Sequence, residues 1–271
     1  MYLIKFVCYY IIVIFMNEKE LINYYNKFNE DKRLTTKHGQ VEFLTAIKYI
    51  EKYLKDGDKI LDIGAGTGKY SIYFKNKGYD VEAVELVKHN LKVIEKNNVN
   101  IKTYLANATN LSMIKDDSFD IVLLFGPMYH LISMKQKIDA LREAQRIVKN
   151  DGYIFISYCM NGYAVLTHGF IEGYIKDSIK NNLIDKNYHI ISKSNDLYSY
   201  VRLDEINYLK DTCKLNRINI ISQDGATEYL KKIINKMDEE TFKIYLNYHF
   251  KTCERKSLLE SSRHILDILT K

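Results

Sequence analysis

Residues 59–68 read Lys-Ile-Leu-Asp-Ile-Gly-Ala-Gly-Thr-Gly and are the most informative stretch of this chain. The apolar side chains in its first half predict the end of a buried strand. The three glycines predict a turn with almost no side chain, and the amphipathic residues 70–74 predict a helix after it. A strand, a glycine turn and a helix in this order let a ligand approach bare backbone amides at a helix N-terminus.

The glycine spacing indicates which ligand that is. A dinucleotide site needs the pattern G-x-G-x-x-G, with a third glycine where the helix packs on the strand. Here the glycines are Gly64, Gly66 and Gly68, and Lys69 stands where that third glycine would be. Asp62 precedes the turn and would repel a pyrophosphate. A carboxylate at this place suits a cationic ligand that carries an ammonium or a sulfonium group.

The D-x-G-x-G-x-G pattern resembles motif I of the class I S-adenosylmethionine-dependent methyltransferases. The resemblance implies that S-adenosyl-L-methionine is the cofactor and that Asp62, Gly64, Ala65 and Gly66 contact it. It covers residues 20–160 firmly and the last part of the chain more loosely. A glycine-rich turn without a ligand is the alternative.

Acids and amides after the next two predicted strands fit the same family. The second strand ends at Glu85, where an acid in a doubly wound sheet bonds the ribose hydroxyls, and Leu86 would form a wall of the adenine slot. Residues 101–109 predict the third strand and its loop, with Asn107 and Ala108 as further cofactor contacts. The family usually has an aspartate in place of Asn107, but an amide oxygen can also accept from the adenine amino group. The alternatives are a solvated acid at the strand end and a turn residue that bonds its own backbone.

The fourth predicted strand ends at Phe125, another expected cofactor contact, and residues 126–131 read Gly-Pro-Met-Tyr-His-Leu. This segment holds the only proline of the chain and is similar to a signature of a bacterial branch of small class I methyltransferases. Tyr129 and His130 would flank the transfer site, with His130 as a candidate general base because its ordinary pKa is close to neutrality. In the alternative interpretation both side chains only pack the loop or line the pocket.

The remaining elements complete the predicted fold. A helix over 137–148, a fifth strand over 153–159 and a sixth over 217–222 continue the alternation of strands and helices that is typical of a parallel sheet. The family places its last strand, here 263–269, antiparallel between the fifth and the sixth. We therefore expect a Rossmann-like α/β fold with a doubly wound, mostly parallel seven-stranded sheet.

Three further segments surround the expected methyltransferase domain at 56–271. Residues 160–215 are predicted to be an insertion on the substrate side, and residues 17–55 a helical cap over the cofactor. The candidates for contacts of this lid with cofactor or substrate are Tyr25, Arg33 and His38. A solvated connection between two helices is the alternative.

Residues 1–16 are almost wholly apolar but too short for a confident membrane span. They are expected to be an extension outside the functional fold, with a membrane anchor as the alternative.

Composition limits the classes of function. The chain has 271 residues, of which 46% are hydrophobic, so it can bury one sizeable core. Its net charge of +6 comes from scattered lysines, so nucleic-acid binding is not indicated. The four cysteines show no C-x-x-C spacing. This argues against a zinc site or a disulfide framework and fits a reducing cytoplasm.

We therefore expect a cytoplasmic methyltransferase that acts on a small molecule or a short peptide. A sulfonium is a good leaving group, so transfer is an in-line displacement that needs no metal, and a base only if the acceptor is protonated. The alternatives are an RNA or protein methyltransferase, a nucleoside-binding module without transfer activity and a nicotinamide oxidoreductase. Nothing in the sequence identifies the acceptor or the oligomeric state.

Overall fold

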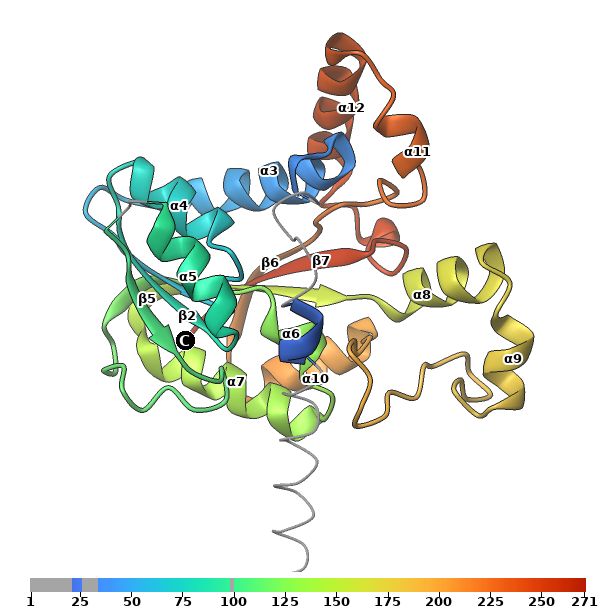
Figure 1. Ribbon diagram of the computed structural model, residues 1–271, viewed down its shortest axis with the longest axis horizontal. Helices are drawn as coiled ribbons and strands as arrows, with labels where there is room; N and C mark the ends of the chain where they lie inside the picture. Colours follow the sequence, from blue (N-terminus) through green and yellow to red (C-terminus); the bar gives the residue numbers. More distant parts are fainter. Residues whose placement is uncertain (1–20, 26–33, 98–99) are drawn as a thin grey trace, which may run out of the picture.

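The computed structural model describes residues 21–25, 34–97 and 100–271 (Figure 1). The predictions for the apolar residues 1–16 and for Arg33 lie outside the described residues. Within the described part, no helix is both long enough and apolar enough to cross a membrane.

A single seven-stranded sheet forms the centre of the molecule, in the order β3-β2-β1-β4-β5-β7-β6. Strands β1 to β5 run parallel, and β7 is antiparallel to both of its neighbours, β5 and β6. The predicted Rossmann-like fold is therefore confirmed, including the place of the last strand. The strands are β1 (Lys59–Ile63), β2 (Asp80–Glu85), β3 (Lys102–Leu105), β4 (Phe119–Leu124), β5 (Val148–Cys159), β6 (Asn216–Ser222) and β7 (His264–Thr270).

Helices cover both faces of the sheet and bury two separate apolar cores (Figure 1). Side chains of α3 and α4 pack on one face, and side chains of α7 and α10 pack on the other. The longer helices are α3 (Lys37–Glu51), α4 (Lys69–Asn76), α5 (Lys88–Lys96), α7 (Met134–Ile147), α10 (Leu203–Thr212) and α12 (Glu239–Thr252). The shorter ones are α6 (Pro127–His130), α8 (Asn161–Ala164), a π-helix (Val165–Ile171), α9 (Ile175–Lys180), α11 (Lys231–Ile234) and a 3₁₀ turn (Lys256–Leu258).

Local sequence explains where the best-defined helices begin. Ser133 caps α7 in a reciprocal capping box with Gln136, and Thr36 accepts a hydrogen bond from the backbone of Gly39 at the start of α3. These side chains satisfy amides that the first helical turn leaves without partners. The buried residues of α7 recur at helical spacing, which fixes the face that it turns toward the sheet.

Two predicted elements are shorter in the structure than in the sequence analysis. The helix expected over 226–236 is mostly a series of turns, because several of its amides bond carbonyls three residues back, and only α11 is helical. The strand expected over 199–202 is a single bridge between Val201 and Met160, because the chain then enters α10 at Leu203.

A buried ion pair joins the two strands at the mixed edge of the sheet. Arg217 of β6 donates from Nε to Asp267 Oδ1 over 2.7 Å and from Nη2 to Asp267 Oδ2 over 2.8 Å. Asp267 of β7 is fully buried, so its charge depends on this bidentate contact.

Replacing Asp267 by Asn leaves the Arg217 guanidinium against a neutral partner inside the protein. We expect the free energy of unfolding to fall by about 3 kcal/mol, because breaking a buried pair leaves an uncompensated charge. Urea unfolding followed by circular dichroism measures this loss. The matched control is Asp139→Asn, which removes an exposed partner of Lys135 and should cost less than about 0.5 kcal/mol. Equal stability of the two variants would contradict the role given to the buried pair.

Candidate functional site

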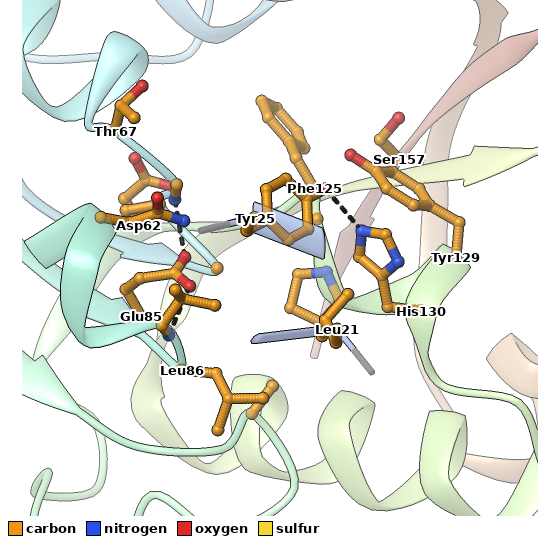
Figure 2. A pocket seen from close by; sticks show the side chains of 18 of the residues that line it. Leu21, Tyr25, Asp62, Thr67, Glu85, Leu86, Phe125, Tyr129, His130 and Ser157 are labelled. Atoms are coloured by element: carbon orange, nitrogen blue, oxygen red, sulfur yellow. Dashed lines mark hydrogen bonds between the residues drawn. The ribbon is translucent and has the colours of Figure 1, made fainter. Parts of the chain in front are cut away.

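One pocket gathers most of the residues that the sequence singles out (Figure 2). It lies where β1, β2, β4 and β5 end, as expected at the carboxyl edge of an open parallel sheet. Among its lining residues are Tyr25, Asp62, Gly64, Ala65, Gly66, Glu85, Leu86, Asn107, Ala108, Phe125, Tyr129 and His130. Of the sequence-predicted site residues that the structure describes, all but His38 are thus brought together.

The glycine turn fits closely against the Gly-Pro segment. Gly64 and Gly66 both have positive φ angles, of 76° and 56°. A Cβ atom on Gly64 would lie 2.4 Å from Cδ of Pro127, so no side chain fits there. At Gly66, by contrast, an added Cβ would meet nothing within 4 Å. The turn therefore packs on one neighbour and leaves bare backbone toward the pocket.

Asp62 is a buried carboxylate at the base of this turn. Its Oδ2 accepts a hydrogen bond from Ser71 Oγ over 2.6 Å, and the residue is 2% exposed. Burial raises the pKa of Asp62 to about 6, although the bond from Ser71 opposes the rise. The charge of Glu85 raises it further. A cationic ligand would relieve this penalty, because an opposite charge nearby favours the ionised carboxylate.

Glu85 is held by the backbone of the turns around it. Its Oε2 accepts from the amide of Gly66, and its Oε1 accepts from the amide of Val87, both over 2.8 Å. Burial raises the pKa of Glu85, while hydrogen bonds from these amides and from the Asn90 side chain lower it. Each carboxylate oxygen can accept two hydrogen bonds, so capacity remains for ligand hydroxyls.

Asn107 lines the pocket but acts locally as a turn residue. Its Oδ1 accepts from the backbone amide of Thr109 over 3.0 Å and from Thr109 Oγ1 over 2.9 Å. This arrangement favours the alternative reading of Asn107, because a short amide side chain readily stabilises a turn two residues ahead. The expected hydrogen bond from an adenine amino group to Asn107 stays a prediction. Oδ1 would have to accept it in addition to the two hydrogen bonds from Thr109.

On the other side of the pocket, His130 links two distant segments. Its Nδ1 lies 2.8 Å from the carbonyl oxygen of Leu197, and its Nε2 lies 2.8 Å from the hydroxyl of Tyr25. A carbonyl can only accept, so Nδ1 carries the proton and Nε2 accepts from Tyr25. Burial lowers the pKa of His130 to about 4, so the ring is neutral at physiological pH. Figure 2 shows Tyr25 next to His130, with the hydrogen bond drawn as a dashed line to the imidazole ring.

A buried lysine that the sequence analysis did not single out supports the loop of His130. Nζ of Lys137 donates to the carbonyl oxygens of Met128 and Leu131, and the lysine is 1% exposed. Burial lowers the pKa of Lys137 to about 7. The position of Lys137 in the sequence could have drawn attention to it, because this lysine lies at the start of an amphipathic helix, one residue before the apolar Ile138.

The lid differs from the predicted one. His38 does not line the pocket, because its Nδ1 lies 2.9 Å from Thr36 Oγ1 and 3.0 Å from Asn235 Oδ1. Instead, His38 connects the start of α3 to Asn235 at the end of α11. Tyr25 does line the pocket, together with residues that sequence reasoning missed, which include Leu21, Leu34, Glu42 and Ser157. Single residues of these types carry no local pattern that marks them.

The pocket thus has two chemically different halves. We call the part around Asp62, Glu85 and the glycine turn the cofactor half, because it offers carboxylates and backbone to a polar cation. We call the part around Tyr25, Tyr129 and His130 the acceptor half, because it offers aromatic rings and a neutral imidazole. The rings of Tyr129 and His130 are 4.8 Å apart between centroids.

Comparison with known sequences identifies a domain and several relatives. A family model described as a methyltransferase domain matches residues 61–156. An uncharacterized protein of Methanocaldococcus jannaschii is 30% identical over 237 residues, which are 83% of this chain and 88% of that protein. A putative ribosomal RNA large subunit methyltransferase of the same organism is 34% identical over 118 residues, 40% of this chain and 29% of that protein. A ribosomal protein L11 methyltransferase of Dictyoglomus thermophilum is 38% identical over 88 residues, 30% of this chain and 27% of that protein.

Comparison with solved structures gives the same fold. An S-adenosylmethionine-dependent methyltransferase of Thermotoga maritima, described as a possible histamine N-methyltransferase, superposes with a TM-score of 0.58 at 19% identity. The match covers 92% of this chain and 97% of that one. A further such methyltransferase, of Methanosarcina mazei, has a TM-score of 0.55 at 17% identity, over 82% and 96% of the two chains.

The protonation of His130 can be tested directly. We expect its ring to stay neutral, with the proton on Nδ1, down to about pH 5, whereas an unperturbed histidine is half protonated at about pH 6.5. Because the folded-state pKa is lowered, the unfolded chain takes up the proton first, and stability falls as pH drops below about 6.5. NMR of the ring nitrogens measures both tautomer and titration, with the signal assigned by His130→Gln. A midpoint close to that of free histidine would contradict the buried geometry.

Proposed function

This chain belongs to the class I S-adenosylmethionine-dependent methyltransferases, and we propose that it transfers a methyl group to a small molecule or a short peptide. The observation that carries this proposal is the enclosure of the acceptor half. Leu21, Tyr25 and Leu34 line the pocket from segments that precede the sheet, and His130 is 6% exposed. A ligand of limited size fits such an enclosed site better than a folded macromolecule does.

The residues of the cofactor half fit S-adenosyl-L-methionine. We infer that Asp62 pairs with a positive group of the cofactor, since no cation among the described residues offsets the cost of burying its carboxylate. Glu85 is proposed to accept from ribose hydroxyls, and the apolar side chains of Leu86, Ala108 and Phe125 are proposed to line the adenosyl group. When bound, the cofactor supplies an activated methyl group on a sulfonium that leaves readily.

The chain's own contribution to the transfer is then positioning and exclusion of water. In our proposal, the aromatic wall that includes Tyr129 holds the acceptor beside the Gly-Pro turn. Nε2 of His130 accepts a hydrogen bond from the Tyr25 hydroxyl, which fixes the Tyr25 oxygen toward the acceptor half. A pKa of about 4 makes His130 a weak base, so we propose that it orients Tyr25 and assists only acceptors that become acidic during attack.

Macromolecular acceptors are the second candidate. Several of the similar proteins carry names that refer to ribosomal RNA or to ribosomal protein L11. The stretches that match this chain cover only 27% to 41% of those proteins. These matches therefore support a shared cofactor domain more than a shared acceptor.

We propose a cytoplasmic location, which the buried Cys159, Cys213 and Cys253 support, because none of them forms a disulfide.

The acceptor class can be tested with methyl-labelled cofactor and extracts of the source organism. The extract is separated into protein, RNA and a small-molecule fraction that passes a size-excluding membrane. We expect label to accumulate in the small-molecule fraction, because the acceptor half is enclosed. The control is Glu85→Ala, which should lose labelling in each fraction. Enzyme-dependent label in RNA or in a ribosomal protein, with none in the small-molecule fraction, would overturn the proposal.

Replacing Asp62 or Glu85 by Ala should weaken cofactor binding by about tenfold or more. Each change removes a charged hydrogen-bond partner worth roughly 1.5–3 kcal/mol. Calorimetry with S-adenosylhomocysteine and with the cofactor itself measures the affinity. The matched control is Glu82→Gln, which changes a buried acid of the same strand as Glu85 that bonds Lys59 and Tyr104 outside the pocket. Unchanged affinity in both folded alanine variants would reject the assigned site.

A further inference from the structure

A second group of ionisable side chains lies next to the acceptor half. It consists of Glu42 on α3, Asp224 just after β6 and His264 at the start of β7. Because β7 runs antiparallel to β6, the end of β6 and the start of β7 meet at the same edge of the sheet. Figure 1 shows α3 on the same side of the molecule as β6 and β7, and Glu42 also lines the pocket.

The geometry of these three residues, which we call the Glu-Asp-His cluster, is that of a set of metal ligands. One ligand atom from each residue lies within 4.8 Å of the other two. Nδ1 of His264 is 2.7 Å from Oδ2 of Asp224 and 3.6 Å from Oε2 of Glu42. Imidazole nitrogen together with carboxylate oxygen is a donor set that divalent transition metals bind.

The surroundings hold the cluster in a fixed orientation. Oδ1 of Asp224 accepts from Ser262 Oγ over 2.8 Å and from the backbone amide of His264 over 2.9 Å. These contacts occupy one carboxylate oxygen and leave Oδ2 turned toward the imidazole. Hydrogen bonds that orient the ligands from outside are a regular part of protein metal sites.

The balance of charge favours a further cation. Two buried carboxylates face a single imidazole in this cluster. A divalent ion that replaces the Nδ1 proton would leave the cluster neutral, which lowers the cost of burying these groups.

Two buried hydroxyls near Asp224 give an independent indication. Ser222 Oγ and the hydroxyl of Tyr229 have no hydrogen-bond partner among the described residues. Ser222 lies two residues before Asp224, and the charge of Asp224 adds to burial in raising the pKa of Tyr229. Buried hydroxyls are normally satisfied, so such groups point to a water or an ion close to them.

We propose that Glu42, Asp224 and His264 bind a divalent transition metal ion beside the acceptor half. Binding of the ion itself does not depend on the proposed function. Its role does, because an ion next to the pocket would bind an oxygen or nitrogen of the acceptor and favour its deprotonated form. The competing interpretations are a closed ion pair that binds nothing and a site where Glu42 pairs with an ammonium group of the acceptor.

The test uses the full chain, freed of metal with a chelator, without cofactor or acceptor. We expect calorimetric titrations with Mn²⁺ and with Zn²⁺ to show saturable binding of one ion per chain. Mg²⁺ should bind much more weakly, since it prefers oxygen ligands and retains its water.

Variants assign the binding to these residues. Glu42→Gln and Asp224→Asn should each weaken Mn²⁺ binding at least tenfold. The matched control is His168→Gln, which removes the imidazole of an exposed His–carboxylate pair with Glu172 and should leave the affinity unchanged. Circular dichroism checks that each variant is folded. If Asp224→Asn does not fold, Glu42→Gln on the pocket wall still decides the question.

Two results would overturn the proposal. One is a wild-type chain that binds neither Mn²⁺ nor Zn²⁺ saturably, and the other is unchanged affinity in Glu42→Gln. If the metal-free wild type methylates amines and Glu42→Gln raises their KM, the cluster serves an ammonium group and the metal site is rejected. Binding of S-adenosylhomocysteine is measured separately. Its absence would reject the proposed function and leave the metal site standing.

Discussion

The close approach of Gly64 to Pro127 is the contact on which the site depends. A Cβ atom at Gly64 would overlap the proline ring, and one at Gly126 would lie 3.1 Å from the carbonyl oxygen of Gly64. β1 and β4 are neighbouring strands, and the turns that follow them therefore pack too closely for a side chain at Gly64 or Gly126. One of these turns carries the bare amides of the cofactor half, and the other leads into Tyr129 and His130. In the proposed function, the contact between the turns would set the distance from cofactor to acceptor.

The pocket buries acidic side chains on one side and a basic side chain, the imidazole of His130, on the other. Burial raises the pKa of Asp62 and of Glu85, and it lowers the pKa of His130. In both cases desolvation disfavours the charged form. On the carboxylate side, the proposed cationic cofactor would relieve this penalty. On the histidine side the penalty is avoided by losing the proton, which leaves a neutral hydrogen-bonding surface for the acceptor.

The sequence predicted those parts of the site that follow from position along a strand. Asp62 and Glu85 end neighbouring parallel strands, so topology alone brings them together, and glycine spacing distinguishes the ligand class. Residues placed by packing between distant segments could not be predicted in this way. His38 faces Asn235 instead of the pocket. Tyr25 was predicted as a lid residue, but its contact with His130 depends on how a separate helix lies over the sheet.

The antiparallel last strand has a consequence for the acceptor half. A parallel strand in the place of β7 would begin at the opposite edge of the sheet, far from the pocket. Because β7 is reversed, His264 lies opposite Cys159, the last residue of β5, at the edge where the ligands bind. The ring of His264 is 5.9 Å from that of Tyr129 between centroids. The mixed edge thus adds ionisable groups to a side of the pocket that the parallel strands supply mainly with aromatic and apolar ones. The chemistry of the acceptor half therefore depends on the direction of one strand as much as on the glycine turn.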